Sequence, residues 1–112
     1  MQCILMNEIY KIGIGTTTTA NRDDAETIAN ILLNENLVSC VQIIEGIKSK
    51  FIWDGKIQEV SESKLTVKFK LNDTEKIENR IIELHKYDTP QWVYWSANSY
   101  SSFHEWVHNP QN

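Results

Sequence analysis

Cysteine and long apolar runs are scarce in this sequence of 112 residues. The two cysteines, Cys3 and Cys40, form no C-x-x-C pair and are too few for a disulfide framework, which favours a reducing compartment. No run approaches the roughly 18 apolar residues that indicate a membrane-spanning helix. The opening residues 1–10 lack a basic region ahead of a long apolar segment, so we expect no signal peptide. These absences predict a cytoplasmic protein with no membrane partner.

Positive charge is also in deficit, because 11 Lys and Arg residues face 15 Asp and Glu residues, for a net charge of -4. That balance disfavours non-specific binding to nucleic acid. Segment 68–71 also lacks the glycines and stacking aromatics of an RNA-recognition strand. We therefore predict no nucleic-acid partner and interpret the clustered lysines as protection of long strand edges. These lysines are Lys48, Lys50, Lys56, Lys64, Lys68 and Lys70.

The composition is that of a folded globular chain, with 41% hydrophobic and 23% charged residues. A chain of this length buries enough surface to fold without disulfides. No internal repeat, low-complexity tract or linker interrupts it. We predict one domain over residues 1–112.

The first half of the chain predicts a strand followed by an amphipathic helix. Residues 11–19 alternate isoleucine with glycine and then become a threonine run, which is typical of a strand. The glycines indicate close approach by a neighbouring element. Asn21 is a candidate N-cap for a helix that ends near 34–36. Its apolar positions recur at helical spacing: Ala25, Ile28, Ala29, Leu32 and Leu33.

A long β-hairpin is the clearest feature of the centre. A strand begins near Val38 and continues past a bend at Gly46. Asp54 and Gly55 suit the two positive-φ positions of a type I′ turn. The returning strand runs to about Leu71 and alternates an apolar face with a polar one. Its apolar face consists of Leu65, Val67, Phe69 and Leu71.

The remaining segments predict a second helix, a fourth strand and a terminal helix. Asn72 and Glu75 match a capping box at the start of the second helix. The segment that contains this helix ends at Pro90. Residues 91–97 are strand-like. The terminal helix has an apolar face of Tyr100, Phe103, Trp106 and Val107. The order β-α-β-β-α-β plus one helix predicts an α+β ferredoxin-like sandwich, with an antiparallel sheet and both main helices on one face.

Two features of this fold predict an oligomer. Hairpin arms of roughly 13 to 15 residues far exceed the common strand length of about 5 to 6, and two helices cannot cover them. The consecutive residues 92–95 place bulky apolar groups on both faces of the fourth strand. A second subunit would cover the face that the helices leave exposed.

Several motifs together resemble the CutA divalent-cation tolerance family over most of the chain. They are Leu37 to Val41, Ile44 to Gly46, Phe51 to Ile57, Glu62, Lys68 and His85 to Pro90. The resemblance implies a homotrimer of ferredoxin-like subunits whose long hairpins wrap a neighbour. It also implies tolerance of divalent cations such as copper, with no established catalysed reaction.

The resemblance implies a set of site residues around a cleft between subunits. The set contains Trp53, Glu62, Lys68, Tyr87 and Asp88, together with Cys40 and His85. Imidazole and thiolate suit copper or zinc, so Cys40 and His85 are the candidate metal ligands. This chain departs from the family pattern at Thr17, Lys86 and Gln91, where several members have a cysteine, a proline and an acid.

The residues alone leave alternatives open at these positions. Cys40 is either a small buried hydrophobe or a thiol that lines the cleft. His85 either interacts with the last carbonyls of its helix or binds a ligand. Packing and salt bridges explain Trp53, Glu62 and Lys68 as well as a ligand role does, and the same is true of Tyr87.

Three functions are consistent with these patterns. The first is a metal-responsive trimeric binding protein, the second a PII-like sensor that binds a small polar ligand between subunits, and the third an assembly scaffold. No nucleophile with an adjacent base and no phosphate-cradling glycine loop is visible, so we predict that the protein is not an enzyme.

One motif points elsewhere, because residues 104–108 spell H-E-x-x-H, the helix motif of zinc peptidases. On a helix, His104 and His108 lie on one face. A catalytic site needs a third protein ligand, which in such peptidases follows the motif, and only residues 109–112 follow here. We interpret the motif as coincidental for catalysis and as at most a surface zinc or nickel site.

Overall fold

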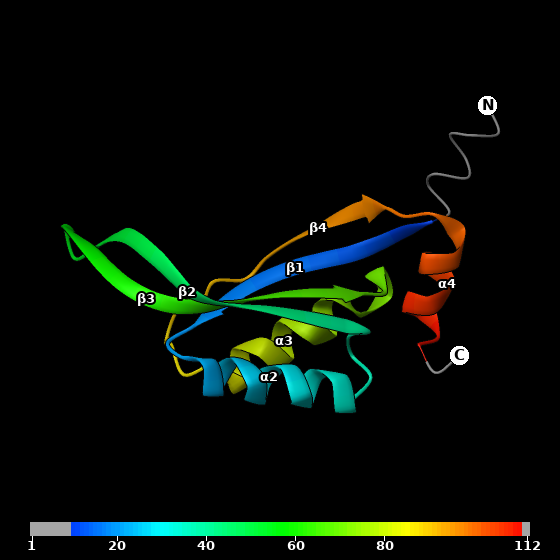
Figure 1. Ribbon diagram of the computed structural model, residues 1–112, viewed down its shortest axis with the longest axis horizontal. Coiled ribbons are helices and arrows are strands. Elements are labelled where there is room, and N and C mark those ends of the chain that lie inside the picture. The colour runs from blue at the N-terminus through cyan, green and yellow to red at the C-terminus, as the bar shows by residue number, and fades with distance from the viewer. Residues whose placement is uncertain (1–9, 111–112) are drawn as a thin grey trace.

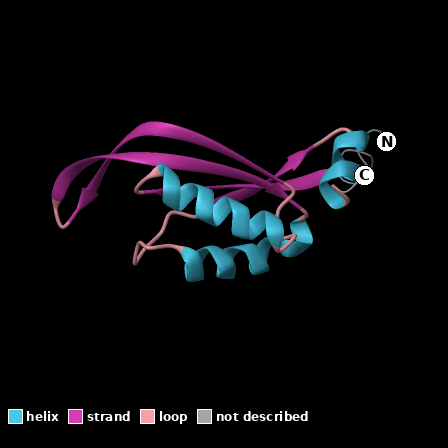
Figure 2. Cartoon of the chain, turned by 60° about the horizontal axis from the view of Figure 1, so that its bottom comes forward, coloured by secondary structure: helices cyan, strands magenta, loops and turns pink. Residues whose placement is uncertain are grey.

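A four-stranded antiparallel sheet of order β2-β3-β1-β4 carries both main helices on one face. In the computed structural model, which describes residues 10–110, helices α2 and α3 lie side by side beneath the sheet (Figures 1 and 2). This arrangement confirms the predicted ferredoxin-like fold. The strands are β1 (Lys11–Thr19), β2 (Cys40–Trp53), β3 (Lys56–Phe69) and β4 (Val93–Asn98). The helices are α2 (Arg22–Asn34), η1 (Leu71–Asp73), α3 (Thr74–Leu84) and α4 (Ser101–His108).

Helix α2 begins where the sequence predicts. Asn21 has extended backbone angles, and its side-chain oxygen accepts a hydrogen bond from the backbone N–H of Asp24 at 2.8 Å. This bond satisfies one of the free N–H groups at the helix start. The predicted apolar positions Ala25, Ile28, Ala29 and Leu32 are buried in the core, and Leu33 is exposed.

The core lies between β3 and the two main helices. Leu65, Val67 and Phe69 of β3 are fully buried, as are Ile77 and Ile81 of α3. Two glycines of β1 make room for aromatic rings. A Cβ atom at Gly13 would lie 2.2 Å from the Phe69 ring, and one at Gly15 would lie 2.2 Å from the Trp92 ring. The close approach predicted at these glycines is confirmed.

The β2–β3 hairpin extends beyond the helices (Figure 1). Each arm has 14 residues, and the turn has positive φ at both Asp54 (52°) and Gly55 (73°). The predicted type I′ turn is therefore confirmed. A bulge between Ile44 and Ile47 interrupts the ladder, with Gly46 at φ 69°. Beyond the bulge, exposed apolar side chains line the arms: Phe51, Ile52, Trp53, Ile57 and Val60.

The predicted start of the second helix is wrong. Strand β3 ends at Phe69, and the 3-10 turn η1 takes up Leu71, which the sequence assigned to the strand. Helix α3 begins at Thr74, and the Thr74 hydroxyl donates to the carbonyl of Leu71 at 2.7 Å. Asn72 lies inside the turn and caps no helix, because the chain tightens before α3 begins.

Two boundaries in the last third of the chain also differ. Strand β4 begins at Val93 rather than at Gln91, since Trp92 packs against the core before the ladder with β1 starts. Tyr100 precedes α4 as its N-cap residue and is exposed, so it does not belong to the inner face. Val107 is buried, as predicted. No helix within residues 10–110 is long and apolar enough to cross a membrane.

Candidate functional site

A buried acid and a phenol meet where the hairpin leaves the body of the molecule. Glu62 of β3 is only 8% exposed, and the Tyr87 hydroxyl donates to its Oε2 atom at 2.8 Å. A buried carboxylate is costly unless it is hydrogen-bonded, so this bond stabilises Glu62. Burial, followed by the bond to Glu62, raises the pKa of Tyr87 to about 12. The phenol therefore stays a hydrogen-bond donor at neutral pH.

His85 holds the Tyr87 loop against the end of β1. Its Nε2 atom lies 2.7 Å from the carbonyl oxygen of Thr18, which can only accept, so Nε2 carries the proton and donates. Its Nδ1 atom accepts from the backbone N–H of Tyr87 at 3.1 Å. The imidazole therefore bonds β1 instead of the last carbonyls of α3. Both ring nitrogens are engaged, so metal ligation by His85 would require one of these bonds to break.

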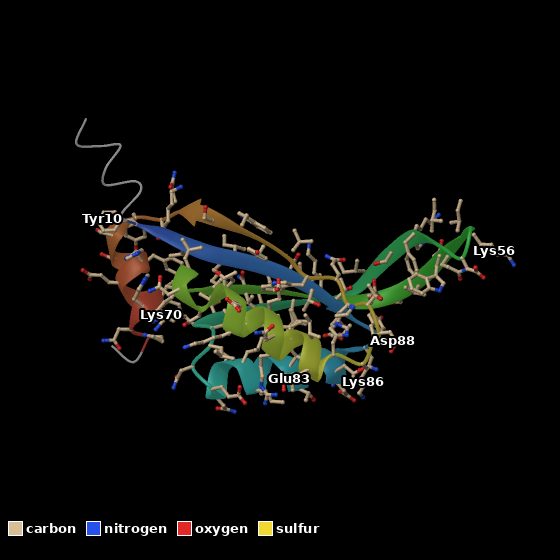
Figure 3. The ribbon with its side chains drawn as sticks, turned by 180° about the vertical axis from the view of Figure 1, so that it is seen from behind. Tyr10, Lys56, Lys70, Glu83, Lys86 and Asp88 are labelled. Carbon is tan, nitrogen blue, oxygen red and sulfur yellow. The ribbon has the colours of Figure 1, made fainter. Side chains whose placement is uncertain are left out.

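Beside this cluster is a hollow of about 670 Å³. Phe51 and Trp53 of β2 line it together with Glu62, Tyr87 and Asp88, so acids and aromatic rings share one space. Figure 3 labels Asp88 and Lys86 at the base of the hairpin, with Lys56 at its tip. The volume lies within the range of about 300–1,000 Å³ typical of small-ligand sites. The structure thus brings four predicted site residues together: Trp53, Glu62, Tyr87 and Asp88.

Two of the three departures from the family pattern lie in this region. Lys86 and Gln91 line the hollow. The Lys86 ammonium pairs with Asp24 at 2.8 Å, and the hydrogen bond to Asp24 raises the pKa of Lys86. Thr17 is fully buried, and its hydroxyl has no hydrogen-bond partner among the described residues.

Cys40 and Lys68 lie elsewhere on the sheet. They are partners across the β2–β3 ladder, and the Lys68 ammonium sits 5.6 Å from the centre of the Phe103 ring of α4. Lys68 also pairs with Ile14, four residues along β1 from the Thr18 that His85 contacts, a separation of about 13 Å. One chain therefore does not bring Cys40 and His85 together. Within residues 10–110, no group of three or more His, Cys, Asp or Glu side chains could hold a metal ion.

Sequence reasoning missed several residues around the cluster and the hollow, among them Thr18 and Phe51. Thr18 acts through its backbone carbonyl, which no side-chain pattern reveals. Phe51 lines the hollow, and its place on the alternating hairpin could have indicated this. A strand residue two positions from Trp53 points to the same side of the sheet.

Comparison with known proteins identifies the family to which this chain is similar. The model of the CutA1 divalent ion tolerance protein family matches residues 14–110. The chain is 32% identical over 93 residues to the chloroplastic protein CutA of Arabidopsis thaliana, covering 82% of this chain and 51% of that protein. It is 36% identical over 76 residues to the divalent-cation tolerance protein CutA of Thermus thermophilus, covering 68% of this chain and 74% of that protein. The chain thus spans about half the length of the plant relative.

Solved structures agree with this assignment. The CutA1 structure from Ehrlichia chaffeensis superposes with a TM-score of 0.85 at 30% identity, covering 90% of this chain and 95% of that one. The structure of the periplasmic divalent cation tolerance protein CutA from Archaeoglobus fulgidus gives 0.85 at 27% identity, covering 90% and 99%. These names describe tolerance of cations and no catalysed reaction. With its fold, its hairpin and this match over most of its length, the chain belongs to the CutA1 divalent ion tolerance protein family.

Proposed function

We propose that this protein is a metal-responsive homotrimer that binds a divalent cation, copper or zinc, in the hollow at the base of the hairpin. The observation that carries the proposal is the buried carboxylate of Glu62, which lines the hollow beside Asp88. A carboxylate has about four acceptor positions, and the Tyr87 hydroxyl uses one of them. Carboxylate oxygens are common ligands of zinc.

A neighbouring subunit would complete the coordination sphere. Two carboxylates of one chain are fewer than the four ligands of a typical closed zinc site. Trp53 lines the hollow and is also exposed on the hairpin arm. A subunit that covers this arm would therefore also approach the hollow and add its own side chains. Assembly and binding are coupled in this proposal.

Exposed apolar groups support the homotrimer. They occupy the outer hairpin at Phe51, Ile52 and Ile57, and the edge strand β4 at Val93, Tyr94 and Trp95. Apolar patches of this kind mark interfaces between proteins. Native mass spectrometry of tag-free protein should give the mass of three 13.0 kDa chains. A monomer would contradict the assembly.

Calorimetric titration with copper or zinc tests the site. Glu62→Gln keeps the hydrogen-bonding shape but removes the charge, and it should weaken binding roughly tenfold or more. Glu59→Gln is the matched control, because Glu59 lies on the same strand, is exposed and pairs with Lys50 at 3.3 Å. Equal affinity in both variants would remove Glu62 from the site.

The prediction that Cys40 or His85 binds the metal stays a prediction. Cys40→Ser and His85→Ala, titrated in the same way, test it separately from Glu62. If only the Cys40 variant loses affinity, the metal lies near Lys68 and Phe103 rather than in the hollow.

A second candidate is a PII-like sensor of a small polar ligand. The aromatic lining by Phe51, Trp53 and Tyr87 favours it, since flat rings bind organic ligands. Native mass spectrometry separates the two functions. A bound organic molecule would add mass to the protein, and treatment with a metal chelator would not remove that mass. The prediction of a cytoplasmic location also stays a prediction, since one relative is named chloroplastic and one structure is described as periplasmic.

A further inference from the structure

The two histidines of helix α4 lie next to each other at the end of the molecule opposite the hairpin. Their ring centres are 4.1 Å apart, with an angle of 32° between the planes. Figure 1 shows α4 beyond the ends of α2 and α3, and Figure 3 labels Tyr10 in the same region, far from Asp88. His104 and His108 thus take no part in the hollow proposed above.

The hydrogen bond of His108 fixes which ring nitrogen is available. Its Nδ1 atom lies 2.9 Å from the backbone carbonyl oxygen of His104. A carbonyl accepts only, so Nδ1 carries the proton and the lone pair is on Nε2. Metal-binding histidines commonly use this arrangement, in which one nitrogen donates to a carbonyl and the other ligates. His108 is therefore already in the tautomer that a metal needs.

His104 is held in place by an aromatic neighbour. Its ring meets the Tyr10 ring edge-on, with centres 5.5 Å apart and planes at 64°. This contact restricts the imidazole before any ion arrives, which reduces the entropy cost of binding.

The space around the pair admits an ion and further ligands. A hollow of about 550 Å³ is lined by both imidazoles and by Ser102, Glu105 and Asn109. With metal–nitrogen distances of about 2.0–2.1 Å, two imidazoles on one ion have centres about 5 Å apart. The observed 4.1 Å is slightly shorter. A small rotation of one side chain therefore opens the pair around an ion.

We propose that His104 and His108 form a second metal site, a two-imidazole chelate for a divalent transition ion of the Cu²⁺, Ni²⁺ and Zn²⁺ group. Imidazole nitrogen suits these ions, and Cu²⁺ binds most tightly among them. Water fills the remaining positions. The spacing of the H-E-x-x-H motif thus serves ion binding without the third protein ligand that hydrolysis requires.

The test uses the whole chain with the Glu62→Gln substitution, so that metal binding at the first site is weakened and contributes little to the measurement. Calorimetry and electron paramagnetic resonance with Cu²⁺ should report roughly one ion per chain with nitrogen ligation. His104→Gln combined with His108→Gln should remove this ion, and each single variant should bind roughly tenfold or more weakly. Circular dichroism checks that the fold is unchanged.

A matched spacing variant distinguishes chelation from histidine content. His108→Asn combined with Asn109→His keeps the composition but places the second imidazole five positions from His104, after the end of α4. It should lose the ion, whereas the hairpin substitution Glu59→Gln should keep it. Copper stoichiometry and nitrogen signals that stay unchanged in the double glutamine variant, or in the spacing variant, would overturn the proposal. Neither result depends on whether Glu62 binds a metal.

Discussion

The two halves of the β2–β3 hairpin, on either side of the bulge between Ile44 and Ile47, have opposite environments. On the inner side, Leu65 and Phe69 are 0% exposed, because α2 and α3 cover that part of the sheet. On the outer side, Ile52 and Ile57 are 75% and 79% exposed. All four side chains are apolar, so residue type alone does not explain the contrast.

The two halves of this continuous hairpin therefore have different roles. The inner half contributes to the hydrophobic core, because α2 and α3 pack against it. The outer half has no helix beneath it (Figure 2). Its apolar side chains gain burial only from another molecule. The following predictions test this division, beginning with the largest expected effect.

The largest effect concerns assembly. Ile52→Asp combined with Ile57→Lys replaces a cross-strand apolar pair by an opposite-charge pair, which preserves the hairpin. Each isoleucine buried at an interface contributes about 1.5–3 kcal/mol, so charged replacements should convert the proposed trimer to 13.0 kDa monomers. Sedimentation velocity measures this. Exchanging the exposed pair by Lys50→Glu with Glu59→Lys is the control and should leave the proposed trimer intact.

The next effect concerns the core. In the monomeric background just described, Phe69→Ala should lower the free energy of unfolding by about 3–5 kcal/mol, because it leaves a cavity in the core. Phe51→Ala should lower it by less than about 1 kcal/mol, since that ring is already partly exposed. Urea unfolding measures both. Equal losses would mean that the outer arm belongs to the same folding unit as the core.

The smallest effect lies at the junction of the two halves. The pKa of Tyr87 is raised to about 12, so the folded state holds this proton more tightly than the unfolded state does. Its contribution to stability is therefore complete below about pH 10 and is lost as the pH rises toward 12. Absorbance of phenolate should be the same for the parent and Tyr87→Phe up to about pH 11 and differ above it. A difference that begins at a lower pH would show that Tyr87 is exposed to solvent.

Local signals predicted the elements well where the determining contacts are close in the sequence. Asn21 bonds Asp24, and the Asp54–Gly55 turn needs only its own dihedral angles. The alternation along β3 also identified the buried face correctly up to Phe69. The capping box at Asn72 failed because a 3-10 turn fits the same residues, and a motif of four residues cannot distinguish the two.

The candidate site depended on contacts between distant segments. Tyr87 meets Glu62 across 25 positions and His85 meets Thr18 across 67. Family resemblance could name Glu62, Tyr87 and Trp53, but only the fold shows that they share a hollow with Asp88 and that Cys40 does not. Tertiary packing sets such pairs, and no local pattern encodes it.

A small change in the bend at Gly46 produces a large displacement of the hairpin tip. The segment from Ile47 to Trp53 extends about 20 Å past this bend, so a change of 10° in the bend moves the tip by about 3–4 Å. Gly46 has φ 69°, and a Cβ atom there would meet nothing within 4 Å. A larger residue at this position is opposed by backbone strain alone, not by packing. The residue at position 46 therefore sets the direction in which the outer hairpin extends. A substitution there should change the position of the hairpin tip more than the stability of the fold.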